Sequence, residues 1–570
     1  MNTPYKIYPT LEDAELVLRK SEPLFADTET DGFYGAVVLV QLYQPHLDHV
    51  IIVENPSEFM LSLFTDKFIT VWHNAHYDLT TLQQQTSTRF IPKVFHDTFY
   101  LGRLAFPHKE KFSLDEIFTY VLGYCPYTRQ GLDKKVLQKT KWSGTLSSNQ
   151  YLYAATDVYY MPQVWDKVKS YLDDISYELD MYTLRYCLDF QWNGMPTSDA
   201  AIEAKYEENN TEIEAANLPI NVNSYVQVRK FLDSEESDDL ALARMHAEGI
   251  EEAGLVRKVR KLIKQNSFLK KFQTVEGRIF GKFLPSARSG RLTSKDQNLQ
   301  QLPRKLKGMF EAPEGRVLIY SDYAQVELRT ICALTNCANM ERLFRDGTDL
   351  HGFTAEGIFG EGWTKDERNL SKTYNFNFLY GGGILVLLQI LLVQAGVLLT
   401  EQQGVRDRRK WRRLWPEIYA WQERGISAWR NKRLGSTALG RKYLAKMMTD
   451  QLNIENQGSA AEVAKLALHY FYPKLKAYNE EHDVDFMLCN FIHDSFITEG
   501  PDIPEHYQAI GKLKAECMQR AWFEMSNCFK IKDLPMPVDV IVGTNWGDIE
   551  DDDKPNIWEF SLEGMATYVP

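Results

Sequence analysis

The sequence predicts a multidomain α/β protein, and three observations lead to this prediction. The chain has 570 residues, which is too many for a single hydrophobic core. Strand-like segments occupy residues 23–53, and helix-like segments follow them to about residue 180, which is typical of an α/β domain. Apolar strand patterns return near residues 316–323 and 485–500, on either side of a mostly helical region.

Composition limits the class of protein. Hydrophobic residues make up 44% of the chain and charged residues 25%, which is ordinary for a soluble globular protein. The formal net charge of -12 excludes a histone-like protein, but not an enzyme that confines its basic residues to one nucleic-acid groove. The seven cysteines form no C-x-x-C pair, so we expect reduced thiols and a cytoplasmic location rather than disulfides or a zinc site.

One segment has the composition of a membrane span. Residues 384–399 are nearly all apolar, but they are few for a bilayer and include Gln389, Gln394 and Gly396. We therefore expect a buried helix there. The N-terminus also lacks the charged-then-apolar pattern of a signal peptide, so no membrane association is expected.

A first set of acidic residues lies in the N-terminal α/β region. Asp27 and Glu29 alternate on one predicted strand, so both side chains point to the same face. Asp78 lies in WHNAHYDL, and Tyr153 and Asp157 are one helical turn apart in YLYAATDVYY. A single acid is usually a surface residue, but a D-x-E pair inside an apolar strand needs a partner such as a metal ion. Hard oxygen ligands suit Mg²⁺ or Mn²⁺.

A second set of acidic residues lies farther along the chain. Asp322 ends an apolar strand that runs into a helix, and Asp494 lies between two apolar strands that predict a hairpin. An Asp at a strand end is most often a turn or cap residue when it occurs alone. Two such carboxylates together are the minimum for a two-metal phosphoryl-transfer site.

A helical ridge lies between these two acids. Its members recur every four residues and are Arg368, Lys372, Phe376 and Tyr380. Two cations followed by two aromatic rings form no core stripe. They are expected to form a surface that can hold a triphosphate at one end and stack on a base at the other.

The first acidic set resembles the three motifs of 3′→5′ exonucleases of the DEDD type, in the tyrosine subclass. The resemblance implies an RNase H-like domain with two metal ions, for which Asp27, Glu29 and Asp157 would be ligands. Asp78 would help to hold the second ion, and Tyr153 would orient the attacking water. One ion would generate hydroxide and the other would stabilise the leaving 3′ oxygen.

The second set resembles motifs A, B and C of family A DNA polymerases, the family of bacterial DNA polymerase I and many phage replicases. The resemblance implies a right-hand polymerase domain of thumb, palm and fingers after the exonuclease domain. It makes Asp322 and Asp494 the ligands of two Mg²⁺ ions, with Mn²⁺ as an alternative, and the Tyr323 carbonyl a supporting ligand. The family usually has Glu after the motif C Asp, whereas this chain has Ser495.

The same resemblance implies the substrate contacts. Arg368 and Lys372 would bind the triphosphate, Phe376 and Tyr380 would contact the sugar and base, and Glu327 would exclude a ribose 2′-hydroxyl. Relatives with Phe at the position of Phe376 discriminate against dideoxynucleotides. The remaining assignments are Gln325 to the nucleotide, Arg291 and Asn298 to the primer–template minor groove, Gln457 to the template and His493 to the primer terminus. A basic segment at residues 257–271 would suit duplex phosphates, although a charge run is more often a solvated helix face.

These motifs predict the order of domains along the chain. The expected segments are an exonuclease domain at 1–185, a thumb at 186–285, a first part of the palm at 286–345, fingers at 346–440, and a second part of the palm with a C-terminal tail at 441–570. The segment between Asp189 and Leu284 is too short for the thumb insertion that binds thioredoxin in some phage relatives. A processivity factor of that type is therefore not indicated. There is also no room for a 5′-nuclease domain before the exonuclease motifs.

The function expected from this resemblance is DNA-templated DNA synthesis with proofreading. The partners would be primer–template DNA and deoxynucleoside triphosphates, with a helicase or a single-strand-binding protein as further partners. We expect the chain to be a compact replicase of phage type that acts in the host-cell cytoplasm.

Three alternatives make different predictions. A single-subunit RNA polymerase is opposed by Glu327 and by the exonuclease motifs. A nuclease with an inactive polymerase half would lack Asp322 or Asp494, and both are present. A lesion-bypass polymerase is opposed by the retained exonuclease carboxylates.

Overall fold

The structure is a computed structural model that describes residues 3–56, 60–65, 67–551 and 554–563. The chain forms two compact units. The first unit comprises residues 1–192 with the short segments 283–285 and 440–444, and the second comprises the rest. The fold class is the expected one, with separate α/β architecture in each unit.

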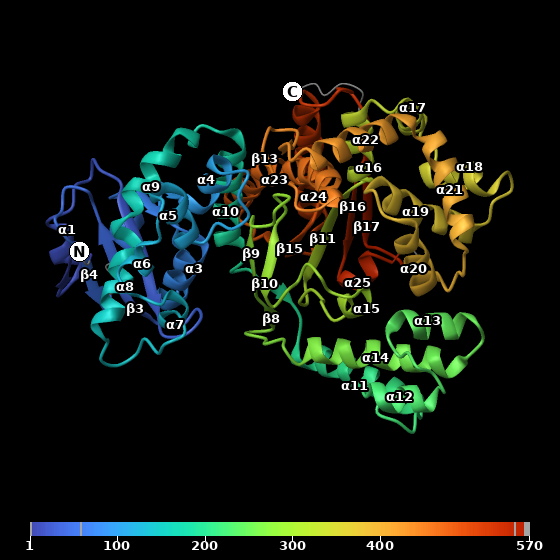
Figure 1. The fold of residues 1–570 in the computed structure, drawn as a ribbon, viewed down its shortest axis with the longest axis horizontal. Helices are drawn as coiled ribbons and strands as arrows, with labels where there is room; N and C mark the ends of the chain where they lie inside the picture. Colours follow the sequence, from blue (N-terminus) through green and yellow to red (C-terminus); the bar gives the residue numbers. More distant parts are fainter. Residues whose placement is uncertain (1–2, 57–59, 66, 552–553, 564–570) are drawn as a thin grey trace. The chain divides into compact units, whose positions relative to one another are not determined.

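A six-stranded mixed sheet forms the centre of the first unit (Figure 1). Its order is β1-β4-β3-β2-β5-β6, with β3 antiparallel to β2 and β4, and β5 parallel to β2 and β6. The strands are β1 (Tyr5–Tyr8), β2 (Leu24–Thr30), β3 (Val37–Tyr43), β4 (Val50–Glu54), β5 (Thr70–Trp72) and β6 (Phe95–Asp97). Nearly every residue of β3 and β4 is buried, as expected for strands that lie inside a sheet.

Helices surround this sheet. They are α1 (Leu11–Glu15), α2 (Met60–Thr65), α3 (Ala75–Thr86), α4 (Thr98–Ala105), α5 (Leu114–Leu122), α6 (Pro126–Arg129), α7 (Lys134–Leu137), α8 (Ser148–Tyr159), α9 (Met161–Val168), η1 (Lys169–Tyr171) and α10 (Ile175–Phe190). Helix α8 packs on β2, β3 and β4, which brings its inner face to the strand that carries Asp27 and Glu29. A capping box between Ser147 and Gln150 fixes its first turn. The last helical part of this unit is not one continuous helix, since α9, η1 and α10 are separate elements.

The second unit contains a five-stranded antiparallel sheet in the order β14-β15-β11-β16-β17. Its strands are β11 (Arg316–Tyr323), β14 (Met487–Ile492), β15 (Ser495–Pro501), β16 (Val538–Gly543) and β17 (Trp558–Leu562). Helix α24 (Pro504–Ser526) packs on β11, β15, β16 and β17, and the 35-residue helix α23 (Met448–His482) packs on α24. The alternating burial along β11 leaves Tyr320 and Asp322 on the opposite, more open face.

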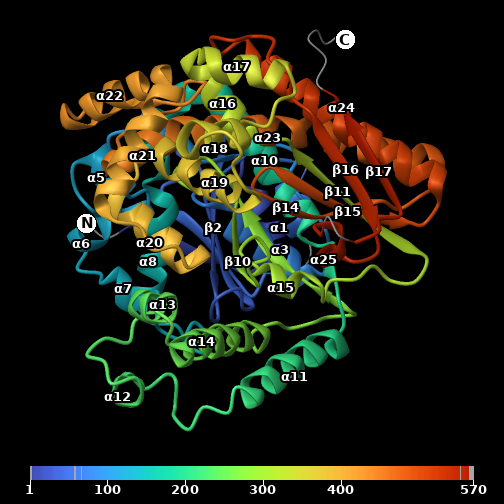
Figure 2. The ribbon, with the colours of Figure 1, turned by 90° about the vertical axis from the view of Figure 1, so that its right-hand side faces the viewer.

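A helical group with its own small core precedes this sheet in the chain. Its helices are α11 (Asp199–Ala215), α12 (Tyr225–Phe231), α13 (Asp239–Ala247) and α14 (Glu251–Leu269), shown in green in Figure 2. The core residues are Val222, Val228, Leu242, Ala253, Val256 and Val259. The short elements that flank this group are β7 (Met195–Pro196), β8 (Arg278–Ile279), β9 (Gly281–Leu284), β10 (Thr293–Asp296) and α15 (Arg304–Lys307).

A run of helices connects β11 to α23, and the short helix α25 (Trp546–Ile549) lies between β16 and β17. The helices of this run are α16 (Val326–Thr335), α17 (Ala338–Arg345), α18 (Leu350–Phe359), α19 (Lys365–Leu379), α20 (Ile384–Ala395), α21 (Glu401–Leu414) and α22 (Pro416–Arg430), followed by β12 (Gly435–Ser436) and β13 (Lys442–Tyr443). The expectation of a buried helix at residues 384–399 is wrong in part. Helix α20 ends at Ala395, and Leu385 and Val386 are 63% and 47% exposed. None of the helices in the described part of the chain has the length and hydropathy that a membrane span requires.

Two candidate carboxylate active sites

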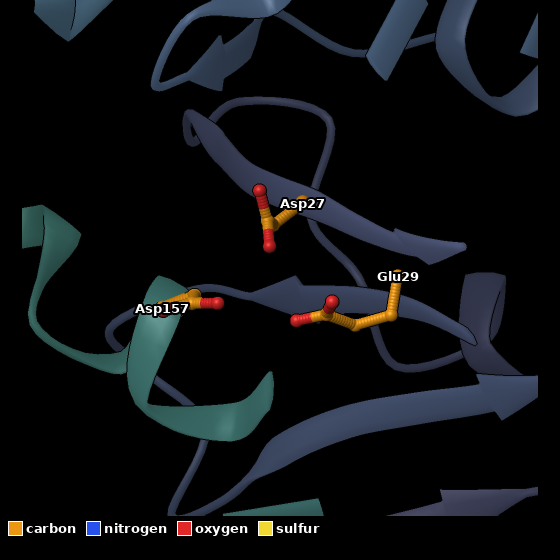
Figure 3. A group of neighbouring side chains, drawn as sticks. All are labelled: Asp27, Glu29 and Asp157. Carbon is orange, nitrogen blue, oxygen red and sulfur yellow. The ribbon is translucent and has the colours of Figure 1, made fainter. Parts of the chain in front are cut away.

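Three acidic residues of the first unit converge on one point. Asp27 and Glu29 point from β2, and Asp157 points from α8 toward the same space (Figure 3). Each can offer a carboxylate oxygen so that the three oxygens lie within 4.8 Å of one another. This donor set suits a hard divalent cation such as Mg²⁺. The structure therefore brings together three of the predicted metal ligands.

Asp78 lies beside this group but does not belong to it. Its carboxylate accepts hydrogen bonds from the Thr28 amide at 3.0 Å and from the Thr28 hydroxyl at 2.7 Å. Helix α3 carries Asp78 in its first turn, and Asp97 accepts hydrogen bonds from the backbone of Asn74 and Ala75 at the start of that helix, each at 2.8 Å. Asp78 is therefore held against β2, where its charge still acts on Asp27.

Tyr153 lies one turn before Asp157 on the same face of α8 and is buried. Its ring packs between Tyr127, at a centroid distance of 5.4 Å, and Trp142, at 6.0 Å. Burial and the nearby carboxylates, Asp157 first, hold the pKa of the Tyr153 phenol well above its ordinary value. Tyr153 therefore keeps its proton and can act as a hydrogen-bond donor at this site.

Burial and mutual repulsion raise the pKa values of the acidic residues at this site. Burial, followed by the charge of Asp78, raises the pKa of Asp27 well above its ordinary value, and Glu29 is raised in the same direction by burial and Asp157. Burial raises the pKa of Asp157 to about 6 and that of Asp78 to about 7. Such crowding is unfavourable without a counter-charge, which a divalent cation would supply.

We expect the metal-free protein to lose stability as the pH rises from 3.8 to about 6, because folding raises the pKa of Asp157 across that window. Asp157→Asn is then expected to stabilise the EDTA-treated protein at pH 8, by up to about 3 kcal/mol, and to stabilise it less at pH 5. Urea unfolding at the two pH values measures the difference. An Asn variant that is less stable than the parent at pH 8 would contradict the expectation.

The sequence interpretation missed an aromatic group beside these acids. Phe33 is 73% exposed in the turn after β2, and its ring lies 4.5 Å from that of Tyr34 and 5.6 Å from that of Tyr77. Tyr77 precedes Asp78, and its hydroxyl is 2.6 Å from that of Thr30. The signal was two consecutive aromatic residues directly after the Asp31-Gly32 turn. Exposed rings of this kind stack on unpaired bases.

Asp322 and Asp494 lie close together in the second unit. Asp322 is on the central strand β11, and Asp494 is in the turn that joins β14 to β15, directly after His493, which has a φ of 58°. Strand β15 pairs with β11, so the turn ends beside Asp322. Burial and the charge of Asp494 hold the pKa of Asp322 well above its ordinary value, and burial raises the pKa of Asp494 to about 6.

The two strands that flank Asp322 place different side chains beside it, a serine from β15 and an aspartate from β16. Ser321 pairs with Phe496, which places Ser495 opposite Asp322 at the next position, and the Ser495 hydroxyl donates to the Ile492 carbonyl at 3.0 Å. On the other side, Asp322 pairs directly with Asp539 of β16, whose charge contributes to the raised pKa of Asp322. Asp539 was not identified from the sequence, because strand pairing between distant segments leaves no local signal.

The predicted nucleotide ridge lies on α19, with Tyr380 at its end. Arg368 donates two hydrogen bonds to Asp349, at 2.5 and 3.0 Å, and Asp349 also caps the N-terminus of α18. Lys372 is exposed. The buried His351 lies near both cations, which contribute with burial to lowering its pKa to about 4. The structure thus adds Asp349 and His351 to the predicted ridge.

Glu327 connects two of the predicted substrate contacts. Its carboxylate pairs with Arg291 and accepts a hydrogen bond from the Tyr380 hydroxyl. The amide of Asn456, which precedes the predicted template contact Gln457 on α23, donates to the same hydroxyl at 3.3 Å. The charge of Arg291 also opposes the raised pKa of Asp494. Residues from five separate sequence segments, around positions 291, 327, 380, 456 and 494, therefore lie near one another.

Three other predicted substrate contacts are Gln325, Asn298 and Phe376. Gln325 is exposed and caps α16 in a left-handed conformation, with a φ of 57°. Asn298 accepts a hydrogen bond from the Gln300 amide at 3.0 Å, and the Gln300 side chain donates to the Phe491 carbonyl on β14 at 2.7 Å. Phe376 is half-buried, with its ring 6.3 Å from that of His351.

The basic segment on α14 is partly occupied by protein contacts. Arg257 pairs with Asp239 at 2.8 Å and donates to the Val393 carbonyl in the last turn of α20 at 3.0 Å. Arg260 donates to the carbonyls of Val222 and Ser237. Duplex-phosphate binding therefore stays a prediction for the exposed lysines of this segment, which are Lys258, Lys261, Lys264, Lys270 and Lys271, although Lys258 also pairs with Glu212.

Comparisons with known proteins identify the families that the two parts of the chain resemble. Residues 196–548 match the family model of DNA polymerase family A, and residues 4–173 match that of a 3′-5′ exonuclease. DNA polymerase I of Aquifex aeolicus is 26% identical, over 93% of this chain and 96% of that protein. A thermostable DNA polymerase I of Thermus filiformis is 30% identical, over 48% of this chain and 33% of that protein.

A solved structure has the same fold. It is the polymerase domain of Pol1 from M. smegmatis in a complex with a DNA primer-template and dNTP. The TM-score is 0.75 at 18% identity, over 95% of this chain and 98% of the other. The match to the polymerase family model covers more than half of the 570 residues. The chain belongs to DNA polymerase family A, and a 3′-5′ exonuclease domain precedes its polymerase domain.

Proposed function

We propose that the chain extends a DNA primer on a template with deoxynucleoside triphosphates and removes mispaired 3′-terminal nucleotides. The observation that carries the proposal is the presence of a separate group of carboxylates in each of the two units, one around Asp157 and one around Asp322 and Asp494. A 5′-labelled primer–template in Mg²⁺ tests it. Shortening of the primer without nucleotides and extension with all four support the proposal, and the absence of either product overturns it.

In the exonuclease unit we assign the chemistry of the tyrosine subclass. Asp27, Glu29 and Asp157 would hold two Mg²⁺ ions, or Mn²⁺, with Asp78 nearby to support the second. Bound cations would supply a hydroxide and neutralise the charge of the leaving 3′ oxygen. Tyr153 keeps its proton and so can orient the attacking water by donating a hydrogen bond.

The aromatic group suggests how this unit binds its substrate. Phe33, Tyr34 and Tyr77 lie next to β2 and Asp78, and Phe33 is largely exposed. A single-stranded 3′ end can stack its last bases on such rings, and stacking is worth about 1–3 kcal/mol per base. A paired end is already stacked in the duplex, so these rings favour frayed, mispaired ends.

In the polymerase unit we assign catalysis to Asp322 and Asp494. Both would be ligands of Mg²⁺, with the Tyr323 carbonyl in support. The primer 3′ oxygen would attack the α-phosphorus, the bond from that phosphorus to the bridging oxygen would break, and pyrophosphate would leave. His493 precedes Asp494 in an exposed turn, where it can contact the primer terminus. Asp539 provides further negative charge beside Asp322 where Ser495 does not.

Nucleotide binding then requires two exchanges of partners. The Arg368 guanidinium is hydrogen-bonded to Asp349 and would bind the triphosphate in place of this carboxylate or together with it. Lys372 adds a second cation one turn away. The hydrogen bond of Tyr380 and the ion pair of Arg291 with Glu327 would break or weaken. The Glu327 side chain could then crowd a ribose 2′-hydroxyl. Arg291 and Asn298 would then contact the minor groove, with Gln325 near the nucleotide and Gln457 near the template.

Phe376→Tyr is expected to raise the incorporation of dideoxynucleotides by more than tenfold, because the added hydroxyl can replace the missing 3′-hydroxyl as a hydrogen-bond partner of the triphosphate. Each tenfold change corresponds to about 1.4 kcal/mol, the size of one such bond. Competition between dATP and ddATP in primer extension measures the ratio. An unchanged ratio would show that α19 does not present Phe376 to the sugar.

The domains, partners and setting are proposed on the same basis. We assign the exonuclease domain to residues 1–185, the thumb to 186–285, the first part of the palm to 286–345, the fingers to 346–440, and the second part of the palm with a C-terminal tail to 441–570. A chain that keeps every exonuclease carboxylate suits a replicative role such as that of a phage replicase in the host-cell cytoplasm. A helicase or single-strand-binding protein would then act beside it.

A further inference from the structure

A buried tyrosine outside the recognised motifs contacts the exonuclease carboxylates. Tyr127 lies on the short helix α6 and is 1% exposed. Its hydroxyl donates a hydrogen bond to Oδ1 of Asp157, one of the three converging ligands. A buried phenol needs a polar partner, and this one is bonded to a group that the proposed chemistry uses.

The ring of Tyr127 makes a second contact with the site. It stacks on the ring of Tyr153 at a centroid distance of 5.4 Å and an interplanar angle of 29°. Tyr153 and Asp157 are one turn apart on α8, so one side chain from α6 contacts both functional members of that helix.

The position of Tyr127 is fixed from the other direction as well. The Lys134 ammonium lies 5.4 Å from the centre of the Tyr127 ring and pairs with Asp115 at 2.5 Å. The Tyr127 carbonyl accepts hydrogen bonds from the amides of Gln130 at 3.0 Å and Leu132 at 2.9 Å. The backbone bonds fix the position of the residue, and turning the ring away would break its contacts with Tyr153 and Lys134 and its hydrogen bond to Asp157.

We propose that Tyr127 is a positioning residue of the exonuclease site. Its hydroxyl holds the Asp157 carboxylate in the orientation that binds metal, and its ring holds Tyr153 in a fixed position relative to that carboxylate. The inference rests on the proposed exonuclease function. An aspartate side chain has several rotamers, and a hydrogen bond from Tyr127 to Oδ1 limits the orientations that the Asp157 carboxylate can take beside Asp27 and Glu29. Partners of metal ligands are typically worth about 10- to 100-fold in metal affinity or activity.

The test compares Tyr127→Phe with Tyr151→Phe in the full chain. Tyr127→Phe removes only the hydroxyl and keeps the ring stack. Tyr151 is a matched control, because its hydroxyl also donates to a carboxylate in the same unit, that of Glu54, which is not one of the three converging ligands. Both changes are made in an Asp494→Ala background, so that Mn²⁺ binding followed by electron paramagnetic resonance reports mainly the exonuclease site.

Tyr127→Phe is expected to weaken Mn²⁺ binding and to lower the exonuclease rate at limiting Mn²⁺, each by about 10- to 100-fold, while excess Mn²⁺ restores much of the rate. Tyr151→Phe is expected to change neither. Equal Mn²⁺ affinity in Tyr127→Phe and its parent would overturn the proposal, as would a rate loss that Mn²⁺ does not rescue. If the parent binds Mn²⁺ but degrades no DNA, the proposed exonuclease function fails, whereas the binding comparison still decides the role of Tyr127.

Discussion

Asp494→Ala is expected to lower the rate of primer extension by at least about 1,000-fold and to leave the exonuclease rate unchanged. Asp494 lies beside Asp322 at the end of the β14–β15 hairpin, and after burial its charge contributes most to the raised pKa of Asp322. Loss of a metal ligand removes several kcal/mol of charge stabilisation, at about 1.4 kcal/mol for each tenfold change in rate. Extension of a labelled primer under single-turnover conditions measures this effect.

A surface acid provides the control for this variant. Asp502 is exposed just after β15, so Asp502→Ala changes the same charge on the neighbouring segment without reaching the open face of the sheet. We expect this control to extend primers at the parental rate. Extension by Asp494→Ala at more than a tenth of the parental rate would show that the second carboxylate pair is not the polymerase centre.

Asp157→Ala is expected to abolish the exonuclease activity and to leave primer extension intact, which is the reverse of the effect expected for Asp494→Ala. It removes one of the three ligands that converge in the first unit, so we expect the exonuclease rate to fall by at least about 1,000-fold. Primer extension depends on Asp322 and Asp494 and should stay within twofold of the parental rate. Degradation of a single-stranded, 5′-labelled oligonucleotide measures the first effect, and extension of a matched primer measures the second.

Asp173→Ala is the corresponding control, because Asp173 is an exposed acid between η1 and α10 in the same unit. It should retain the full exonuclease rate. If Asp157→Ala still degrades the oligonucleotide at a comparable rate, the metal-binding role of the converging carboxylates is refuted.

The carboxylates could be predicted from the sequence because each lies in a local pattern. Asp27 and Glu29 share a strand face, Tyr153 and Asp157 share a helix face, and Asp494 lies between two apolar strands. Spacing within one element determines where such side chains point. The structure confirms the convergence of Asp27, Glu29 and Asp157 and the β14–β15 hairpin.

Residues that reach a site from another element could not be predicted in this way. Tyr127 contacts Asp157 from a helix 30 residues earlier, and Asp539 meets Asp322 only because β16 pairs with β11. Asp349 reaches Arg368 through the packing of α18 on α19. These contacts depend on tertiary packing and strand register, which a single sequence does not encode locally.

Helix α20 shows that burial, too, could be predicted only in part from the sequence. An apolar run of this length predicted a buried helix, but only Ile384, Leu387, Leu391 and Leu392 are buried, since the helix packs on its neighbours through one face. Apolar composition indicates that burial is favourable, but it does not specify how many partners surround the helix.

The central claim is that one chain holds a synthetic site and a proofreading site that act in sequence on the same primer. The most direct test gives the unaltered protein a template with a 5′-labelled primer whose 3′-terminal nucleotide is mispaired, together with Mg²⁺ and all four deoxynucleotides. We expect the primer to shorten by at least one nucleotide before it is extended, and we expect the full-length product to carry the correct base. A full-length product that retains the mismatch, or a primer that is degraded and never extended, would contradict the claim.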